Sequence, residues 1–174
     1  MKKSFLLLFL ICIFGCDKDD KPANPIDQLP PATQTGANTF GCLLDGQAFI
    51  PGGGTNPLDC IYQFVDGGYY FGLQGNKRDD NNDRITIALG TNNRQLQQGY
   101  NYELLENMSG NAFGIYSLSP FSSYTSAVQT GELNITKLDP DNQIVCGTFW
   151  FDVKDHKGII HQIREGRFDM QYTQ

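Results

Sequence analysis

Residues 143–172 read QIVCGTFWFDVKDHKGIIHQIREGRFDMQY, two long segments separated by a short polar break. Apolar side chains alternate with polar ones along the first segment, at Phe149, Phe151 and Val153. Alternation with a period of two is typical of a β-strand with one buried face. The break, residues 155–158, suits a type I turn followed by a glycine in the left-handed conformation. The stretch therefore predicts an antiparallel β-hairpin.

The turn also predicts the register of this hairpin. It sets Val153 opposite His161 and Phe151 opposite Ile163. Towards the C-terminus the apolar residues take the other parity: Phe168, Met170 and Tyr172. A strand with a period of two changes parity only where an extra residue is inserted. We therefore predict a β-bulge at Glu165–Gly166.

The rest of the domain shows the same β pattern in shorter pieces. No segment has a sustained helical period, and Gly, Asn and Asp turns separate the apolar runs. These runs predict about ten strands, over residues 39–44, 49–50, 60–65, 69–74, 84–89, 99–105, 113–117, 123–128, 132–138, 143–153 and 159–172. We predict one all-β domain over residues 39–174, an antiparallel β-sandwich or a barrel-like fold.

The N-terminus predicts an export signal over residues 1–15. Two lysines precede an apolar run over residues 5–14, which is shorter than the roughly 20 residues of a membrane-spanning helix. The run ends in Ile13-Phe14-Gly15-Cys16, which resembles the lipobox of bacterial lipoproteins. That resemblance implies lipidation of Cys16, and several acyl chains anchor a protein stably. The alternative is an ordinary secreted protein with a chance cysteine near its cleavage site.

Residues 16–38 are expected to be the lipidated cysteine and a flexible tether, because four prolines stand among Asp, Asn, Gln and Thr. The segment Asp17–Lys21 resembles the acidic export signal of Bacteroidota lipoproteins. It implies an outer-membrane lipoprotein exposed at the cell surface. As a plain solvated charge run it would only keep the tether extended, and the periplasmic face of the outer membrane is the alternative location.

Composition limits the partners of the chain. Residues 1–15 hold two lysines and no acid, so 11 basic and 19 acidic residues remain after cleavage, a formal charge of −8. This balance argues against binding nucleic acid, which needs clusters of Lys and Arg. Once the tether is set aside, about 137 residues remain, enough for one domain and too few for two.

Three cysteines fall within the predicted domain, Cys42, Cys60 and Cys146. An oxidising compartment permits a disulfide. Cys42 and Cys60 are closest in sequence and fall on strands expected to be neighbours, so one expectation is that they pair. The alternative, which the sequence favours equally, is three buried thiols that pack as small apolar groups.

One loop resembles a calcium-binding loop in part. Asp79, Asn81 and Asp83 have the spacing of its first three ligands. The pattern then fails, because Arg84 stands at the glycine position and Gly90 at the position of the bidentate glutamate. A solvated hairpin loop is the favoured interpretation, with calcium as the alternative, and no other cofactor is expected.

Trp150 is the first candidate for ligand binding. It alternates with Phe149 and Phe151, so it points to the opposite face of its strand, together with Thr148 and Asp152. An exposed tryptophan beside polar groups binds sugar rings or partner loops. The alternative is that a loop or strand covers Trp150. Trp150 and Asp152 are therefore the candidate ligand-binding residues.

The inventory for catalysis is small. The chain has two histidines, lacks a Gly-x-Ser-x-Gly elbow and offers no glutamate pair that the sequence places at glycosidase separation. We therefore expect a membrane-anchored, noncatalytic binding module that recognises a glycan or an envelope protein. The alternative is a small envelope hydrolase that uses acids and tyrosines on one sheet face.

Three parts of the sequence together resemble a known family. They are TFGCLLDGQAFIP at residues 39–51, GELNITKLD at 131–139, and GTFWF at 147–151 with EGRFD at 165–169. They are similar to a family of uncharacterised lipoproteins from Bacteroidota. The resemblance covers Thr39 to Tyr172 and implies an all-β fold. It implies no activity, so no functional residue is carried over.

Overall fold

Eleven strands form one sheet in the computed structural model, which describes residues 24–174. The strands are β1 (Thr39–Leu44), β2 (Gln47–Phe49), β3 (Leu58–Val65), β4 (Gly68–Arg78), β5 (Arg84–Thr91), β6 (Asn101–Leu104), β7 (Ala112–Leu118), β8 (Phe121–Tyr124), β9 (Gly131–Asp139), β10 (Ile144–Lys154) and β11 (Ile160–Gln171). The predicted all-β class is confirmed. The bounds differ most at β8, which was expected over residues 123–128.

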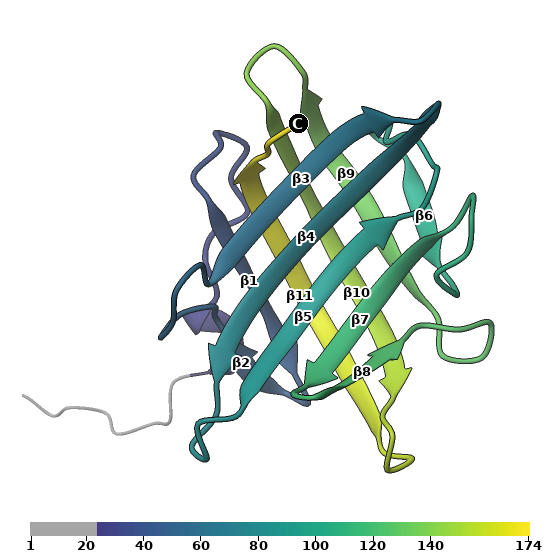
Figure 1. Cartoon of the computed structure of the whole chain (residues 1–174). Helices are drawn as coiled ribbons and strands as arrows, with labels where there is room; N and C mark the ends of the chain where they lie inside the picture. The colour runs from purple at the N-terminus through teal and green to yellow at the C-terminus, as the bar shows by residue number, and fades with distance from the viewer. Residues whose placement is uncertain (1–23) are drawn as a thin grey trace, which may run out of the picture.

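The sheet has the order β2-β1-β11-β10-β9-β6-β7-β5-β4-β3, with β8 paired to β7 beside this path. Every pairing is antiparallel except that of β6 with β7. The sheet curls, so that β3, β4, β5 and β7 lie across β1, β11, β10 and β9 (Figure 1). An isolated bridge between Ile61 and Thr173 joins the curled part to the C-terminal end. The fold is therefore barrel-like without a closed ladder.

The core lies between the two curled layers. Aromatic rings meet across it, with centroids 6.3 Å apart for Phe71 and Phe168 and 5.6 Å apart for Tyr62 and Tyr172. Removing these apolar side chains from water is the main driving force for such packing. The outer faces of both layers stay free to carry polar or binding residues.

The C-terminal hairpin has the predicted register. Val153 lies opposite His161, and Phe151 lies opposite Ile163. Gly158 adopts the left-handed conformation at φ 85°, and the Asp155 amide donates to the Ile159 carbonyl at 2.8 Å. Turn chemistry therefore fixes which face of β10 enters the core.

The predicted bulge is also present. Phe149 pairs with Gly166 and Phe151 with Ile163, so Trp150 alone faces two residues of β11. Glu165, one of those two, has a φ of 54°, which lies in the left-handed region that residues other than glycine seldom adopt. The extra residue switches the parity of β11. As a result, Phe168, Met170 and Tyr172 are buried in the core.

The predicted flexible tether is wrong for its described part, residues 24–38. Pro25–Gln28 form a short 3-10 helix, and the Leu29 side chain is only 7% exposed. Pro30 packs so closely over Gly41 that a Cβ there would lie 2.6 Å from its ring. The composition suggested a linker, but these side chains find partners on the domain. We call residues 24–38 the strap.

The remaining N-terminal predictions fall on residues that the structure does not describe. The signal peptide over residues 1–15, the lipidated Cys16 and the acidic segment Asp17–Lys21 lie outside residues 24–174. Within residues 24–174, no helix has the length and apolar character to cross a membrane.

The predicted Cys42–Cys60 disulfide is not formed. Both residues are free buried thiols, as is Cys146. The pairing assumed neighbouring strands, but β1 pairs with β2 and β11, whereas β3 pairs with β4. Burial raises the pKa of the Cys42 and Cys60 thiols well above the ordinary value, so both stay protonated apolar groups.

A substitution at the bulge tests its packing. A Cβ on Gly166 would lie 2.6 Å from the Phe149 ring, which is itself buried. We expect Gly166→Ala to lower the free energy of unfolding by about 1–3 kcal/mol through overpacking. Gly54→Ala is the matched control, because a Cβ there meets nothing within 4 Å. Equal stability of the two variants in chemical denaturation would contradict this packing.

Candidate functional site

Trp150 lies on the outer face of β10, as the alternation predicts, and is 42% exposed. The alternative expectation, that a loop or strand covers it, is wrong. Its chain neighbours Phe149 and Phe151 are buried in the core, so the strand holds the indole on the outside. Trp150 lines a groove of about 550 Å³ that we call the Trp150 groove. A large apolar ring held out in water suits a binding surface.

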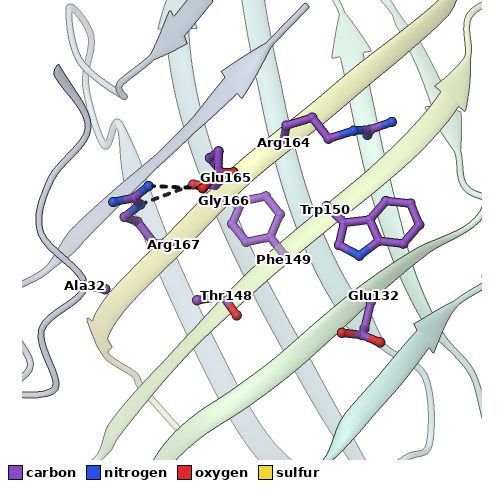
Figure 2. A pocket seen from close by; sticks show the side chains of 9 residues that line it. All are labelled: Ala32, Glu132, Thr148, Phe149, Trp150, Arg164, Glu165, Gly166 and Arg167. Atoms are coloured by element: carbon purple, nitrogen blue, oxygen red, sulfur yellow. Dashed lines mark hydrogen bonds and ion pairs between the residues drawn. The ribbon is translucent and has the colours of Figure 1, made fainter. Parts of the chain in front are cut away.

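The bulge supplies much of this groove. Its lining residues come from the strap, β9, β10 and β11: Ala32, Glu132, Thr148, Phe149, Trp150, Arg164, Glu165, Gly166 and Arg167 (Figure 2). Arg164 and Glu165 are the two residues that face Trp150 across the bulge. One extra residue in β11 therefore gathers charged side chains beside an exposed aromatic ring.

Arg164 is held in place beside the indole. Its guanidinium carbon lies 5.4 Å from the centre of the Trp150 ring, a cation–π distance. Arg164 Nη2 forms an ion pair of 2.6 Å with Asp152, and Nη1 donates to the Phe151 and Ile163 carbonyls at 3.1 and 2.8 Å. These contacts fix the side chains of Arg164 and Trp150 before any ligand binds, which lowers the entropic cost of binding.

Asp152, the second predicted ligand-binding residue, is not part of the groove that Trp150 lines. Its carboxylate instead holds Arg164. The sequence analysis placed Asp152 correctly on the outer face, but it did not single out Arg164 or Glu165 as residues of the site. A bulge predicted at Glu165–Gly166 was the available signal, because bulges redirect side chains beside strands.

Polar side chains extend the surface across the sheet. Two rows of outward-facing residues cross β10, β9 and β6: Trp150–Glu132–Glu103 and Thr148–Asn134–Asn101. The Asn134 side-chain amide donates to the side-chain oxygen of Asn101. Carboxylates accept hydrogen bonds, amides both donate and accept, and hydroxyls do both. The outer face of β10, β9 and β6 therefore offers donors and acceptors beside the indole.

The strap borders the groove and is held by a buried carboxylate. Asp169 on β11 is fully buried, although its parity places it on the outer face. Its two oxygens accept from the Thr33 hydroxyl at 2.6 Å, the Thr35 amide at 2.9 Å and the Gly36 amide at 2.6 Å. The Cys146 thiol also donates to it, at 3.1 Å. We call this arrangement the Asp169 latch.

The latch depends on the charge of Asp169. Burial by itself would raise the pKa of this carboxyl, but the hydrogen bonds from Thr33, Thr35, Cys146 and Gly36 outweigh it and hold the pKa well below its ordinary value. Conversely, burial and the bond to Asp169 raise the pKa of Cys146 to about 12. Cys146 is therefore a protonated donor, not a nucleophile.

The acids and the tyrosine that surround His161 are relevant to the hydrolase alternative, which uses such residue types. His161 Nδ1 lies 2.7 Å from Asp45, and Nε2 lies 3.6 Å from Asp155. The ring stacks on Tyr116 with centroids 4.2 Å apart. His161 lies outside the Trp150 groove.

The candidate calcium loop is a tight turn in the structure. The Asp79 carboxylate accepts from the amides of Asn81 and Asp83 at 2.9 and 2.8 Å. In the described part of the chain, no group of three or more His, Cys, Asp or Glu side chains is placed to hold a metal ion. Calcium binding by Asp79, Asn81 and Asp83 stays a prediction.

Comparison of the chain with protein-family models, curated proteins and solved structures finds no match. The resemblance to uncharacterised Bacteroidota lipoproteins therefore stays a prediction, and the candidate function follows from the groove itself.

The exposure of Trp150 can be measured directly, because it is the single tryptophan of the chain. We expect its emission maximum to lie at long wavelength and acrylamide to quench it efficiently. A tryptophan covered by a loop would emit at shorter wavelength and resist quenching. That second result would contradict the open groove.

The latch predicts an acid-dependent stability. A carboxyl whose pKa is depressed by folding stabilises the folded state above its unfolded pKa of about 4, and this contribution is lost as the pH falls further. We expect Asp169→Asn to cost about 2–4 kcal/mol at pH 7, because a charged acceptor is removed from buried donors. The difference from the wild type should shrink at pH 3.

Thermal unfolding at both pH values checks this expectation. Asp141→Asn, in the exposed β9–β10 turn, is the matched control and should change little at either pH. Should Asp169→Asn fail to fold, Thr33→Ala removes a single donor and should cost about 1 kcal/mol with the same pH trend. A stability gap that is equal at pH 7 and pH 3 would contradict the latch.

Proposed function

We propose that this protein is a noncatalytic carbohydrate-binding module, and that the Trp150 groove is its binding site. The observation that carries the proposal is the 42% exposed indole, fixed by Arg164 on the outer face of a rigid sheet. Tryptophan is enriched at binding surfaces, because its large ring offers an apolar face and its N–H a polar contact.

The chemistry of the groove suits a sugar ring. The C–H face of a pyranose is apolar and packs on an indole, while its hydroxyls need both donors and acceptors at the rim. The Arg164 and Arg167 guanidinium groups supply donors, and the Glu132 carboxylate and Thr148 hydroxyl supply acceptors. Arg167 is itself positioned by its bond to the Glu165 carbonyl at 3.2 Å.

The row of polar residues across β10, β9 and β6 favours an extended ligand over a single sugar. Glu103 and Glu132 stand directly opposite each other on β6 and β9. Like charges in such a pair destabilise a sheet, so packing alone does not favour them. As acceptors they would bind successive hydroxyls of an oligosaccharide chain that runs from Trp150 across β9 to β6.

The proposed setting is the bacterial envelope. In this proposal Cys16 carries the lipid, and the acidic segment after it directs the protein to the outer membrane, at the cell surface. The tether is then shorter than its composition suggested, because the strap packs on the domain from Leu29 onwards. A short tether would hold the groove near the membrane, where envelope or captured glycans are found.

Fluorescence titration tests the proposal, because the reporter is the binding residue itself. The full chain is titrated with cello-, xylo-, malto-, manno- and chito-oligosaccharides, and Trp150 emission is followed. We expect a saturable change with at least one series, larger for longer chains. Trp150→Ala should abolish retention by that glycan in affinity electrophoresis and change stability by less than about 1 kcal/mol.

Two further variants sharpen the result. Trp150→Phe keeps an aromatic platform and should bind more weakly rather than not at all. Phe64→Ala is the matched control, since Phe64 is 63% exposed on β3, outside the groove. Binding that survives in Trp150→Ala, or that is lost equally in Phe64→Ala, would contradict the proposal.

A further inference from the structure

A second concavity lies on the other layer of the fold, with a different chemistry from the Trp150 groove. It has a volume of about 310 Å³ and is lined by residues 52–57 of the β2–β3 loop and by residues of the β4–β5 hairpin. Three cationic side chains line it, Lys77, Arg78 and Arg84. The protein as a whole carries a formal charge of −6, so this gathering of cations stands out.

The two arginines stand directly opposite each other. Arg78 on β4 pairs with Arg84 on β5, at the end of the hairpin. Like charges at opposite positions of an antiparallel pair repel, which lowers stability unless an anion lies between them. None of the ion pairs found within residues 24–174 involves Lys77, Arg78 or Arg84.

The three acids of the adjoining turn, Asp79, Asp80 and Asp83, form no ion pair with these cations. Asp79 turns its carboxylate to the amides of Asn81 and Asp83, as described above. Arg78 donates instead to the Asn82 carbonyl at 2.6 Å. The Arg84 guanidinium takes part in no hydrogen bond or ion pair found in the described residues, so it is available to an added anion.

The glycine-rich loop opposite has a shape that admits a ligand. Both ends of the loop are tied to β4, because the Gly52 amide donates to Asn76 and the Asn76 amide donates to Pro57, at 2.9 and 2.7 Å. A Cβ on Gly52 or Gly54 would meet nothing within 4 Å, and neither residue has a positive φ. Protein packing does not require glycine there, but close approach of a ligand to backbone amides does.

We propose that this pocket binds a tetrahedral oxyanion, the sulfate or phosphate group of an ester. Guanidinium groups donate paired hydrogen bonds that match such oxyanions, and exposed backbone amides of a glycine-rich loop add further donors. Arg78 and Arg84 bind the anion from the hairpin, and Gly53–Thr55 face it from the loop. The site needs no contribution from Trp150, so it stands or falls independently of the carbohydrate groove.

Calorimetric titration of the full chain with inorganic phosphate and inorganic sulfate tests the site, with chloride used to keep the ionic strength constant. We expect saturable binding of at least one anion. Arg78→Gln and Arg84→Gln should each weaken it about tenfold, the loss of roughly one charge-assisted hydrogen bond. Lys157→Gln, which removes one charge at the exposed β10–β11 turn, is the matched control and should bind as the wild type does.

A stability measurement separates a binding role from a structural one. In low salt without phosphate or sulfate, Arg84→Gln should be at least as stable as the wild type, since it removes a repulsion. The anion should raise the melting temperature of the wild type and of Lys157→Gln more than that of Arg84→Gln. No saturable binding, an equal loss in Lys157→Gln, or a destabilised Arg84→Gln that binds as tightly as the wild type would overturn the proposal.

The source of the group follows from a second titration. Glucose 6-sulfate and glucose 6-phosphate are compared with glucose. Tighter binding of the sulfate ester would assign the pocket to sulfated glycans, and tighter binding of the phosphate ester would assign it to phosphorylated saccharides or lipid headgroups. Equal binding of glucose and both esters would overturn the proposal, because the anion would then contribute nothing.

Discussion

The extra residue in β11 is the constraint on which both the core and the candidate site depend. Before it, Ile163 faces inwards, and after it Phe168 and Met170 do so. Without the bulge at Glu165, either Ile163 or the pair Phe168 and Met170 would face water. The fold would then lose the free energy gained by burying those side chains. The register shifts at the same point on both neighbours of β11, β1 and β10. One inserted residue in β11 thus changes the register of its pairing with both β1 and β10.

The same bulge shapes the outer face. It sets Arg164 and Glu165 opposite Trp150 and brings Arg167 into the groove. Bulges redirect side chains without breaking a sheet, which explains why they recur beside binding sites. The rigidity of the site comes from the core beneath it, because Phe149 and Phe151 anchor the residue between them. Fold and candidate function therefore share one structural cause.

A second constraint keeps the N-terminal strap on the domain. Asp169 is buried on the outer face only because Thr33, Thr35 and Gly36 cover it and donate to it. Lys137 adds a bond to the Gln34 carbonyl at 3.0 Å, so the strap is held at two neighbouring points. Ala32 then forms one border of the Trp150 groove. The strap that precedes β1 is thus part of the site's frame.

The sequence predicts the local features well and the distant contacts poorly. The hairpin register, the bulge and the outward direction of Trp150 all follow from alternation and turn chemistry, which act within a few residues. The docking of the strap could not be predicted, because proline and threonine are typical of linkers and their partner Asp169 is more than a hundred residues away. The expected Cys42–Cys60 pair was wrong for the same reason. Strands that are close in sequence need not be neighbours in a curled sheet, and the order of strands depends on contacts between distant residues.

The central claim is that the bulged face around Trp150 binds a carbohydrate. The single indole N–H gives one resolved signal in a ¹H–¹⁵N spectrum, and the bulge amides of residues 164–166 report on the same groove. Added oligosaccharide should shift the indole and these amides together, along one saturable curve, while the amides of β4 and β5 stay in place. An indole signal that does not move while other faces shift, or no shift with any series of glycans, would contradict the account.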